Sequence, residues 1–265
     1  KGTTYTIKYL DDNYVPTSDE QEKCSAARTE FAIALEELGD FLGGLEENGV
    51  KTYMIRPFNE MNINAIYGDK GHDNSTYFKN VWKQVVDYLV NDCELKGILF
   101  VYSPANHINE YSPSMLSLYP GNDYVDIIAP TIYSLNSDGI LPEFDEYDDL
   151  IATGKPFGMS ETAPLNDCYE EIVADSLNML QSFKTTYANA AFASLWFGYN
   201  MGTNKHQNAA EFLTDDYILS IEDEVNYINK TASAATVFGG TSFGSDAVKV
   251  ACGTYNVSDL AVSVA

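Results

Sequence analysis

The sequence predicts an α/β fold in which parallel strands are covered by helices. Two observations carry this prediction: helical and strand patterns alternate along most of the chain with short joints, and the strands are apolar on both faces. A strand buried on both faces is typical of a parallel sheet with helices on either side. A (β/α)8 barrel and an open, doubly wound sheet both fit. No G-x-G-x-x-G or Walker loop follows a strand, which counts against a dinucleotide-binding sheet.

Helices are predicted where apolar residues recur at three- and four-residue steps. The first covers residues 26–47 and ends at Asn48-Gly49, a pair that commonly stops a helix. Trp82 shares such a pattern with Val81 and Val85, so we expect it in the core. The later helical segments are residues 78–89, 113–118, 143–152, 169–187 and 207–228.

Short apolar segments rich in β-branched and aromatic residues separate these helices and are predicted to be strands. They are residues 50–55, 97–102, 125–129, 155–159 and 191–196. Composition changes after Lys230, where the chain becomes rich in Gly, Ser, Thr and Ala. We therefore expect an α/β domain over residues 1–230, and a linker with the beginning of an all-β module over residues 231–265.

Charge and composition exclude several classes of partner. The 265 residues include 39 Asp and Glu against 15 Lys and Arg, a net charge of −24. A nucleic-acid-binding protein needs a basic surface, and an anionic membrane would repel this chain. A neutral polymer is indifferent to the charge. No stretch approaches the ~18 apolar residues of a membrane span.

No metal or cofactor site is expected. The four cysteines lack C-x-x-C spacing. His72, His107 and His206 are far apart on predicted loops, and we expect them at the surface.

Two carboxylates follow predicted strands. Glu60 comes after the 50–55 strand and Glu161 after the 155–159 strand, and Arg56 precedes the first of them. Barrel active sites lie at the carboxyl ends of the strands. Two carboxylates across a barrel mouth suit glycoside hydrolysis, in which one protonates the leaving oxygen and the other attacks the anomeric centre. A nearby Arg would keep the attacking carboxylate ionised.

Further polar and aromatic residues lie at the same strand ends. Asn59 stands beside Glu60 and can hydrogen-bond a sugar hydroxyl. The strand that begins at residue 125 leads to Tyr133, and the 191–196 strand ends in Trp196; both offer rings on which a sugar can stack.

Several segments resemble, in the right order, motifs of glycoside hydrolase family 26, a β-mannanase family of retaining (β/α)8 enzymes. The resemblance covers roughly residues 28–228. It is carried by IRPFNEMN at 55–62, LFVYSP at 99–104, YPGNDYVDII at 119–128 and KPFGMSET at 155–162, which look like the family's strand four, strand five, approach to strand six, and strand seven. It implies an endo-acting enzyme that cleaves a β-linked polysaccharide, most favourably β-1,4-mannan, outside the cell and without a cofactor.

The resemblance also implies roles for individual residues. Glu60 matches the acid/base and Glu161 the nucleophile. Tyr133 matches a Tyr that contacts the nucleophile, and Trp196 matches the Trp beneath the sugar at the point of cleavage. Arg56 matches an Arg near the nucleophile.

Two departures bear on the substrate. Family members usually have His directly before the acid/base, whereas this chain has Asn59. They also have a cluster of aromatic residues after the motif, whereas residues 63–68 of this chain contain a single aromatic residue, Tyr67. A β-glucanase or xylanase of the same clan is therefore an alternative. So is a non-catalytic carbohydrate-binding or structural protein on a degraded barrel, although both carboxylates are intact.

The position of the motif in the chain leads to an expectation about completeness. IRPFNEMN belongs to strand four, yet about fifty residues precede it, and these include the 26–47 helix. We therefore expect strands four to eight, with open edges at the first and last, and poor folding of this chain alone. Residues 234–265 resemble the opening of a βγ-crystallin-like module.

Overall fold

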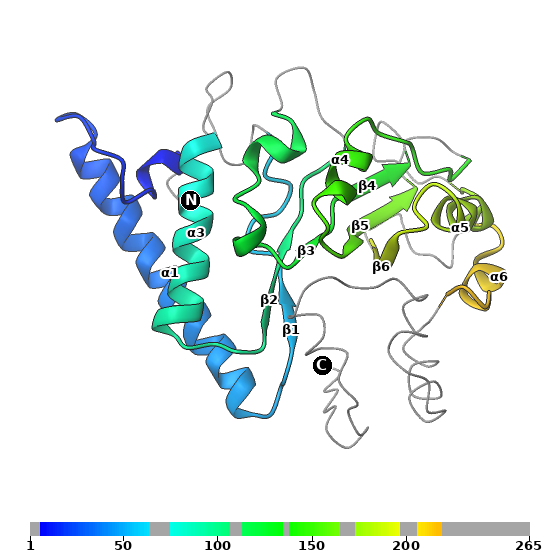
Figure 1. The fold of residues 1–265 in the computed structure, drawn as a ribbon, viewed down its shortest axis with the longest axis horizontal. Helices are drawn as coiled ribbons and strands as arrows, with labels where there is room; N and C mark the ends of the chain where they lie inside the picture. Colours follow the sequence, from blue (N-terminus) through cyan, green and yellow to red (C-terminus); the bar gives the residue numbers. More distant parts are fainter. Residues whose placement is uncertain are drawn as a thin grey trace. The chain divides into compact units, whose positions relative to one another are not determined.

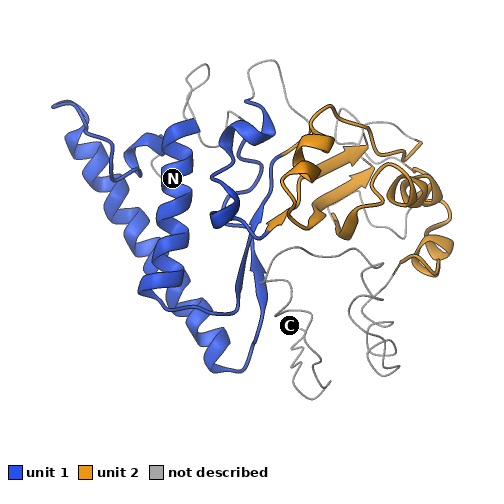
Figure 2. Ribbon diagram, viewed as in Figure 1, with its two compact units in different colours: residues 1–104, 108–126, 260–265 blue, residues 105–107, 127–259 orange. Residues whose placement is uncertain are grey.

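The computed structural model describes residues 6–63, 75–106, 113–134, 138–164, 173–196 and 206–218. Figure 2 shows two compact units, the first made of residues 1–104, 108–126 and 260–265 and the second of residues 105–107 and 127–259. Each unit contains parallel strands and helices, as the sequence predicts (Figure 1). The β module predicted over residues 231–265 lies outside the described residues.

The first unit begins with a long helix and contains two strands. Its elements are a 3-10 turn η1 (Ile7–Tyr9), helix α1 (Gln21–Glu47), strand β1 (Tyr53–Ile55), helix α3 (Ser75–Asp87) with a π-helical turn η2 (Tyr88–Asp92), strand β2 (Ile98–Tyr102), and the 3-10 turns η3 (Met115–Leu118) and η4 (Asn122–Tyr124).

Trp82, on α3, lies in an aromatic core as predicted. Its side chain is fully buried, with ring centroids 5.6 Å from Tyr102 and 5.7 Å from Phe58. The indole N–H donates to the backbone carbonyl of Tyr124 at 2.8 Å, so the polar atom of the ring is satisfied. Since Phe58 directly precedes Asn59, this core anchors the segment that carries the first predicted carboxylate.

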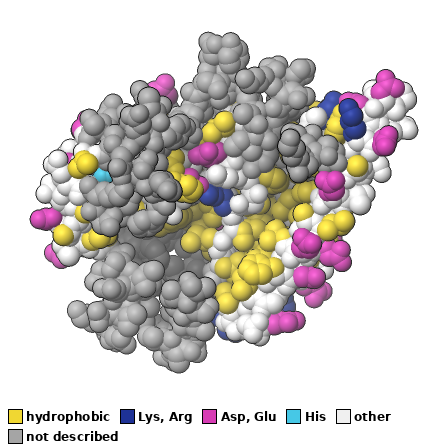
Figure 3. Space-filling view, turned by 180° about the vertical axis from the view of Figure 1, so that it is seen from behind, with side chains coloured by type: hydrophobic (Ala, Val, Ile, Leu, Met, Phe, Trp, Pro, Cys, Tyr) yellow, Lys and Arg dark blue, Asp and Glu magenta, His cyan; other side chains and the backbone are white. Residues whose placement is uncertain are grey.

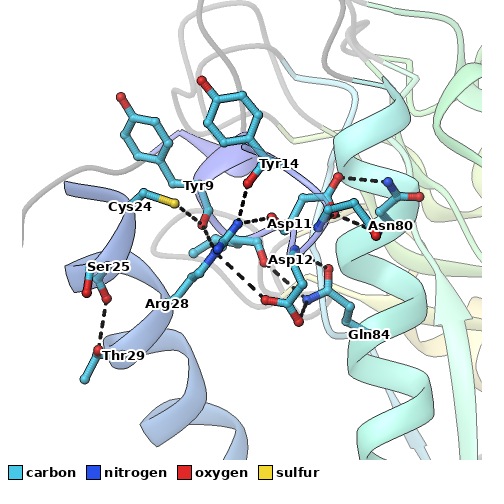
Figure 4. Close-up of polar contacts among 12 residues, drawn as sticks. Tyr9, Asp11, Asp12, Tyr14, Cys24, Ser25, Arg28, Thr29, Asn80 and Gln84 are labelled. Atoms are coloured by element: carbon cyan, nitrogen blue, oxygen red, sulfur yellow. Dashed lines mark hydrogen bonds and ion pairs between the residues drawn. The ribbon is translucent and has the colours of Figure 1, made fainter. Parts of the chain in front are cut away.

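Residues 6–20, which we call the N-terminal hook, fold back onto α1 (Figure 4). Arg28 of α1 donates to the backbone carbonyls of Tyr9 at 3.2 Å and Tyr14 at 2.9 Å. Within the hook, Glu20 accepts from Lys8 Nζ at 2.8 Å and from the Tyr14 hydroxyl at 2.6 Å. These bonds, that of Lys8 foremost, hold the pKa of Glu20 well below its ordinary value.

The N-terminal hook also binds α3. Asp11 accepts from the Asn80 side chain at 2.8 Å, and Asp12 accepts from the Gln84 side chain at 2.8 Å. Asn80 and Gln84 are one turn apart on α3 and present their amides to the same segment. The hook therefore joins α1 to α3 through polar contacts (Figure 4).

Glu46, at the end of α1, holds the start of the β1–β2 pair. One of its oxygens accepts from the backbone N–H of Gly97 at 2.8 Å and of Lys96 at 3.0 Å, and from the Tyr53 hydroxyl at 3.0 Å. Burial would raise the pKa of Glu46, and these hydrogen bonds bring it below its ordinary value. At Gly97 a Cβ would lie 2.5 Å from the carbonyl oxygen of Lys51, so this approach of the two strands requires glycine.

β1 and β2 pair in parallel, with Ile55 opposite Phe100. Among the described strands of the first unit, β1 has no other partner. The side chain of Met54, in the middle of β1, is 54% exposed. The predicted open edge at the strand-four position is confirmed for the described residues.

The second unit is built around a central strand, β5 (Phe157–Pro164). Its elements are strands β3 (Ile127–Ile128) and β4 (Thr131–Ser134), helix α4 (Tyr147–Ala152), strand β5 (Phe157–Pro164), helix α5 (Ser176–Lys184), strand β6 (Ala190–Leu195) and helix α6 (Ala209–Leu213). β5 pairs in parallel with β3, β4 and β6. Within the described residues of this unit, β6 has no partner besides β5.

Two strands differ from the sequence prediction. The strand expected from residue 125 is divided into β3 and β4, separated by Ala129 and Pro130. Proline has no N–H to donate to the ladder, although the Pro130 carbonyl still accepts from the backbone N–H of Ser160 at 3.2 Å. β5 runs to Pro164, well beyond the predicted end at Met159.

Three helices are shorter than predicted. α5 begins at Ser176 because the side chain of Asp175 caps it, accepting from the backbone N–H of Leu177 at 2.9 Å. α4 begins at Tyr147 rather than at residue 143. α6 ends at Leu213, and the described residues beyond it are not helical.

His206 is buried, so the expectation of a surface histidine is wrong. The side chain is 7% exposed, and its Nδ1 accepts from the backbone N–H of Ala174 at 3.3 Å. The backbone N–H of Gln207 returns a bond to the Ala174 carbonyl at 2.9 Å. Burial lowers the pKa of His206, consistent with a neutral ring that accepts a hydrogen bond. His72 and His107 lie outside the described residues.

No helix among the described residues is long and apolar enough to cross a membrane. On the face drawn in Figure 3, Asp and Glu side chains are scattered over the described residues and Lys and Arg side chains are few, as the net charge of −24 implies.

We predict that Gly97→Ala lowers the free energy of unfolding by about 1–3 kcal/mol, because the added methyl group meets a backbone carbonyl that cannot rotate away. Urea unfolding of the intact protein measures the change. Gly43→Ala is the matched control, since a Cβ on Gly43 in α1 meets no atom within 4 Å. That variant should gain about 0.5–1 kcal/mol. Equal effects of the two substitutions would contradict the close approach at Gly97.

We predict that His206 makes the stability of the fold depend on pH. Its folded-state pKa is lower than its unfolded value, near 6.5, so its contribution is complete above that pH. The contribution is lost as pH falls through the folded pKa, because the unfolded state takes up the proton first. Unfolding measured from pH 7.5 downward should show a smaller loss in His206→Gln than in the wild type. Parallel curves for the two proteins would refute the assignment.

Candidate active site

Glu161 is a buried carboxylate held by a tyrosine. Its side chain is 7% exposed, and the Tyr133 hydroxyl donates to Oε2 at 2.9 Å. β4 and β5 are in register, with Thr131 opposite Glu161 and Tyr133 opposite Ala163. Because alternate residues of a strand share a face, Tyr133 reaches diagonally to the carboxylate. The contact predicted between Tyr133 and Glu161 is therefore present.

The sequence predicted that Glu161 follows a strand that ends at Met159. In the structure Glu161 lies inside β5. The strand continues to Pro164, and residues 161–164 pair with residues 131–134 of β4. A carboxylate on a paired strand is held more firmly than one on a loop. Glu161 thus has a fixed backbone as well as a hydrogen-bonded head group.

Trp196 directly follows β6, close in the ladder to Glu161. Its backbone N–H donates to the carbonyl of Thr162 at 3.0 Å. The side chain is 43% exposed. A tryptophan ring that stays partly open to solvent can serve as a stacking surface for a sugar.

Glu60 follows β1 in the first unit, where a bulge shapes the backbone. Pairing with the neighbouring strand resumes at Asn59, which bridges Ser103, and the backbone N–H of Glu60 donates to the Ser103 carbonyl at 2.9 Å. Four steps separate Ile55 from Asn59 but only three separate Phe100 from Ser103, so one extra residue is accommodated. Bulges of this kind re-aim side chains next to active sites.

Glu60 has a left-handed backbone, with φ of 48°. This conformation costs a non-glycine residue about 1–2 kcal/mol, and it persists where the surrounding structure enforces it. The contacts that hold it include the bond from the Glu60 N–H to the Ser103 carbonyl and a bond of 2.9 Å from the Ile63 N–H to the Glu60 carbonyl. The carboxylate therefore leaves the chain in a direction that a regular strand would not give.

Two predicted residues accompany Glu60. Arg56 is half-buried and directly follows β1. The side-chain oxygen of Asn59 is buried and has no hydrogen-bond partner among the described residues, so it can accept a bond from a bound hydroxyl.

The structure brings the predicted residues into two groups. Arg56, Asn59 and Glu60 lie in the first unit, and Tyr133, Glu161 and Trp196 lie in the second. The pairing of Glu60 with Glu161 stays a prediction. Within the described residues, no group of three or more His, Cys, Asp or Glu side chains could hold a metal ion.

Two residues at these sites escaped the sequence analysis. Ser103 is fully buried and supplies the carbonyl that fixes Glu60. Thr131 is fully buried and opposite Glu161 in the ladder. The signal for Thr131 was present in its period-two spacing from Tyr133, but the strand expected over 125–129 stopped before it.

Comparisons with known proteins identify the family of this chain. The family model of glycosyl hydrolase family 26 matches residues 5–223. Mannan endo-1,4-beta-mannosidase A and B of Caldalkalibacillus mannanilyticus is 27% identical over 224 residues, which are 80% of this chain and 41% of that protein. A mannan endo-1,4-beta-mannosidase of Bacillus subtilis is 31% identical over 137 residues, 49% of this chain and 35% of that protein. This chain thus spans less than half the length of either relative.

Solved structures share the fold. Bacillus subtilis mannanase BCman superposes with a TM-score of 0.63 at 24% identity, over 79% of this chain and 57% of that one. The catalytic domain of the family 26 endo-beta-1,4-mannanase from Bacillus sp. JAMB-750 gives 0.62 at 19% identity, over 88% and 64%. The parallel strands described above are therefore those of a TIM-barrel fold, and the chain belongs to glycosyl hydrolase family 26.

Proposed function

We propose that the protein carrying this sequence is an endo-acting β-mannanase that cleaves its polymer with retention of configuration. The observation that carries the proposal is the bond of 2.9 Å from the Tyr133 hydroxyl to Glu161, which holds a buried carboxylate in a family 26 strand. Relatives over 80% and 49% of this chain are named mannan endo-1,4-beta-mannosidases, which supports mannan as the substrate.

The reaction follows double displacement. A Glu161 oxygen attacks the anomeric carbon while Glu60 gives its proton to the departing glycosidic oxygen, so that one sugar chain leaves and a glycosyl ester forms on Glu161. Glu60, now ionised, takes a proton from water. The water oxygen attacks the same carbon, and the ester bond breaks to restore Glu161. Tyr133 keeps the carboxylate aligned for both attacks.

The remaining residues bind the substrate. Arg56 supplies a positive charge, and Asn59 offers its buried side-chain oxygen to a sugar hydroxyl. Trp196, 43% exposed, stacks beneath the sugar at the point of cleavage. A polysaccharide is too large to enter a cell intact, so this enzyme acts outside the cell.

We predict that Glu161→Ala in the intact protein abolishes hydrolysis, because no group remains to form the glycosyl ester. Added azide should restore turnover and yield a glycosyl azide of inverted anomeric configuration, which NMR identifies. Glu60→Ala should lower the rate on polymer by about 10²–10⁴ and spare aryl glycosides with activated leaving groups.

Glu37→Ala, which removes an exposed carboxylate of α1, is the control and should keep full activity. Equal losses in Glu60→Ala and Glu161→Ala on both substrates would refute the separate roles. Inactivity of the wild type on every β-glycan would instead favour a carbohydrate-binding protein.

We predict cleavage of galactomannan or glucomannan in preference to cellulose-type glucan or xylan. Product analysis by chromatography on the three polymer types measures the preference. Asn59→His, which introduces the residue usual in this family, should raise mannan turnover relative to glucan if Asn59 contacts the sugar. Release of oligosaccharides from glucan or xylan alone would reject mannan as the substrate.

A further inference from the structure

Thr131 lies on the same face of the sheet as the proposed nucleophile. Residues two apart in a strand share a face, so Thr131 and Tyr133 point to the same side of β4. Tyr133 contacts Glu161 on that side, at 2.9 Å. In the parallel ladder Thr131 is itself the register partner of Glu161. The threonine is thus the residue of the neighbouring strand whose backbone lies opposite the nucleophile.

The hydroxyl of Thr131 is buried and unused in this arrangement. Thr131 is fully buried, and its Oγ1 has no hydrogen-bond partner among the described residues. On its other side the register neighbour is Ala105, whose side chain has no polar atom. Of the two register neighbours of Thr131, Glu161 is thus the one whose side chain can form a hydrogen bond.

Burial alone does not distinguish Thr131. Thr162 is also fully buried, and its Oγ1 also has no partner among the described residues. Thr162 follows Glu161 in β5, so its side chain points to the opposite face. The two threonines differ in the face on which the hydroxyl lies, and Thr131 alone of the two shares the face of the carboxylate.

We propose that Thr131 is a positioning residue that acts through Glu161, an inference that rests on the proposed function. Rotation about the Cα–Cβ bond moves the Thr131 hydroxyl between staggered positions without moving the backbone. Together with Tyr133, the hydroxyl restrains the Glu161 carboxylate while one of its oxygens attacks the anomeric carbon. A carboxylate held by two donors keeps its attack geometry better than one held by one donor.

The test compares Thr131→Val with Thr131→Ser in the intact protein, assayed on galactomannan. Valine keeps the shape of threonine and removes the hydroxyl, and serine keeps the hydroxyl. We expect kcat of Thr131→Val to fall by on the order of tenfold with KM unchanged, since alignment is lost and binding is not. Thr131→Ser should recover most of kcat. The melting temperature of Thr131→Val should not fall below that of the wild type, because the substitution removes an unpaired buried hydroxyl.

Thr162→Val is the matched control, with the same atoms changed on the opposite face, and should keep kcat and KM. Wild-type kcat in Thr131→Val, equal losses in Thr131→Val and Thr162→Val, or no recovery in Thr131→Ser would each overturn the role of Thr131. A wild type that releases no sugar from any polymer would reject the proposed function itself, an outcome distinct from these.

Discussion

The second unit depends on the parallel pairing of β5. This strand bonds to β3, β4 and β6, and the carboxylate of Glu161 projects from its paired middle. The Phe192 ring of β6 packs directly on Gly158, where a Cβ would lie 2.3 Å from the ring, so the strand needs glycine at this position. A strand held on both sides cannot shift without breaking both ladders. The alignment of Glu161 with Tyr133 follows from that restraint.

In the first unit, the Glu60 carboxylate is positioned by an irregular backbone and not by a paired strand. Glu60 lies beyond a bulge, and its left-handed backbone is held by bonds to the Ser103 carbonyl and from the Ile63 N–H. The aromatic core beneath, with Trp82 at its centre, secures the preceding residue Phe58. One proposed catalytic group therefore lies within a strand that is paired on both sides, and the other lies beyond the end of β1. An acid/base that serves two successive steps and a nucleophile that attacks one carbon make different geometric demands.

The sequence was informative where the local pattern and the tertiary environment agree. The helical spacing around Trp82 placed this residue in the core, and the alternation of helices with parallel strands was predicted as well. The Tyr133–Glu161 contact was implied by the family resemblance. Other features depend on contacts that periodicity does not encode. The ladder with β4 extends β5 past Met159, and the side chain of Asp175 decides where α5 begins. The burial of His206 depends on a backbone N–H thirty-two positions away in the chain.

The N-terminal hook also bears on the order in which the first unit forms. Its contacts with Arg28, and the contact between Lys8 and Glu20 within it, join residues separated by 19 positions or fewer, so closing these loops costs little chain entropy. Its contacts with Asn80 and Gln84 span about seventy residues. Loops of 19 residues or fewer close fast, whereas loops of about seventy residues close more slowly, so the contacts with α3 form later. The beginning of α1 and the hook can thus pack together first. The hook binds α3 later, once the chain between them has folded.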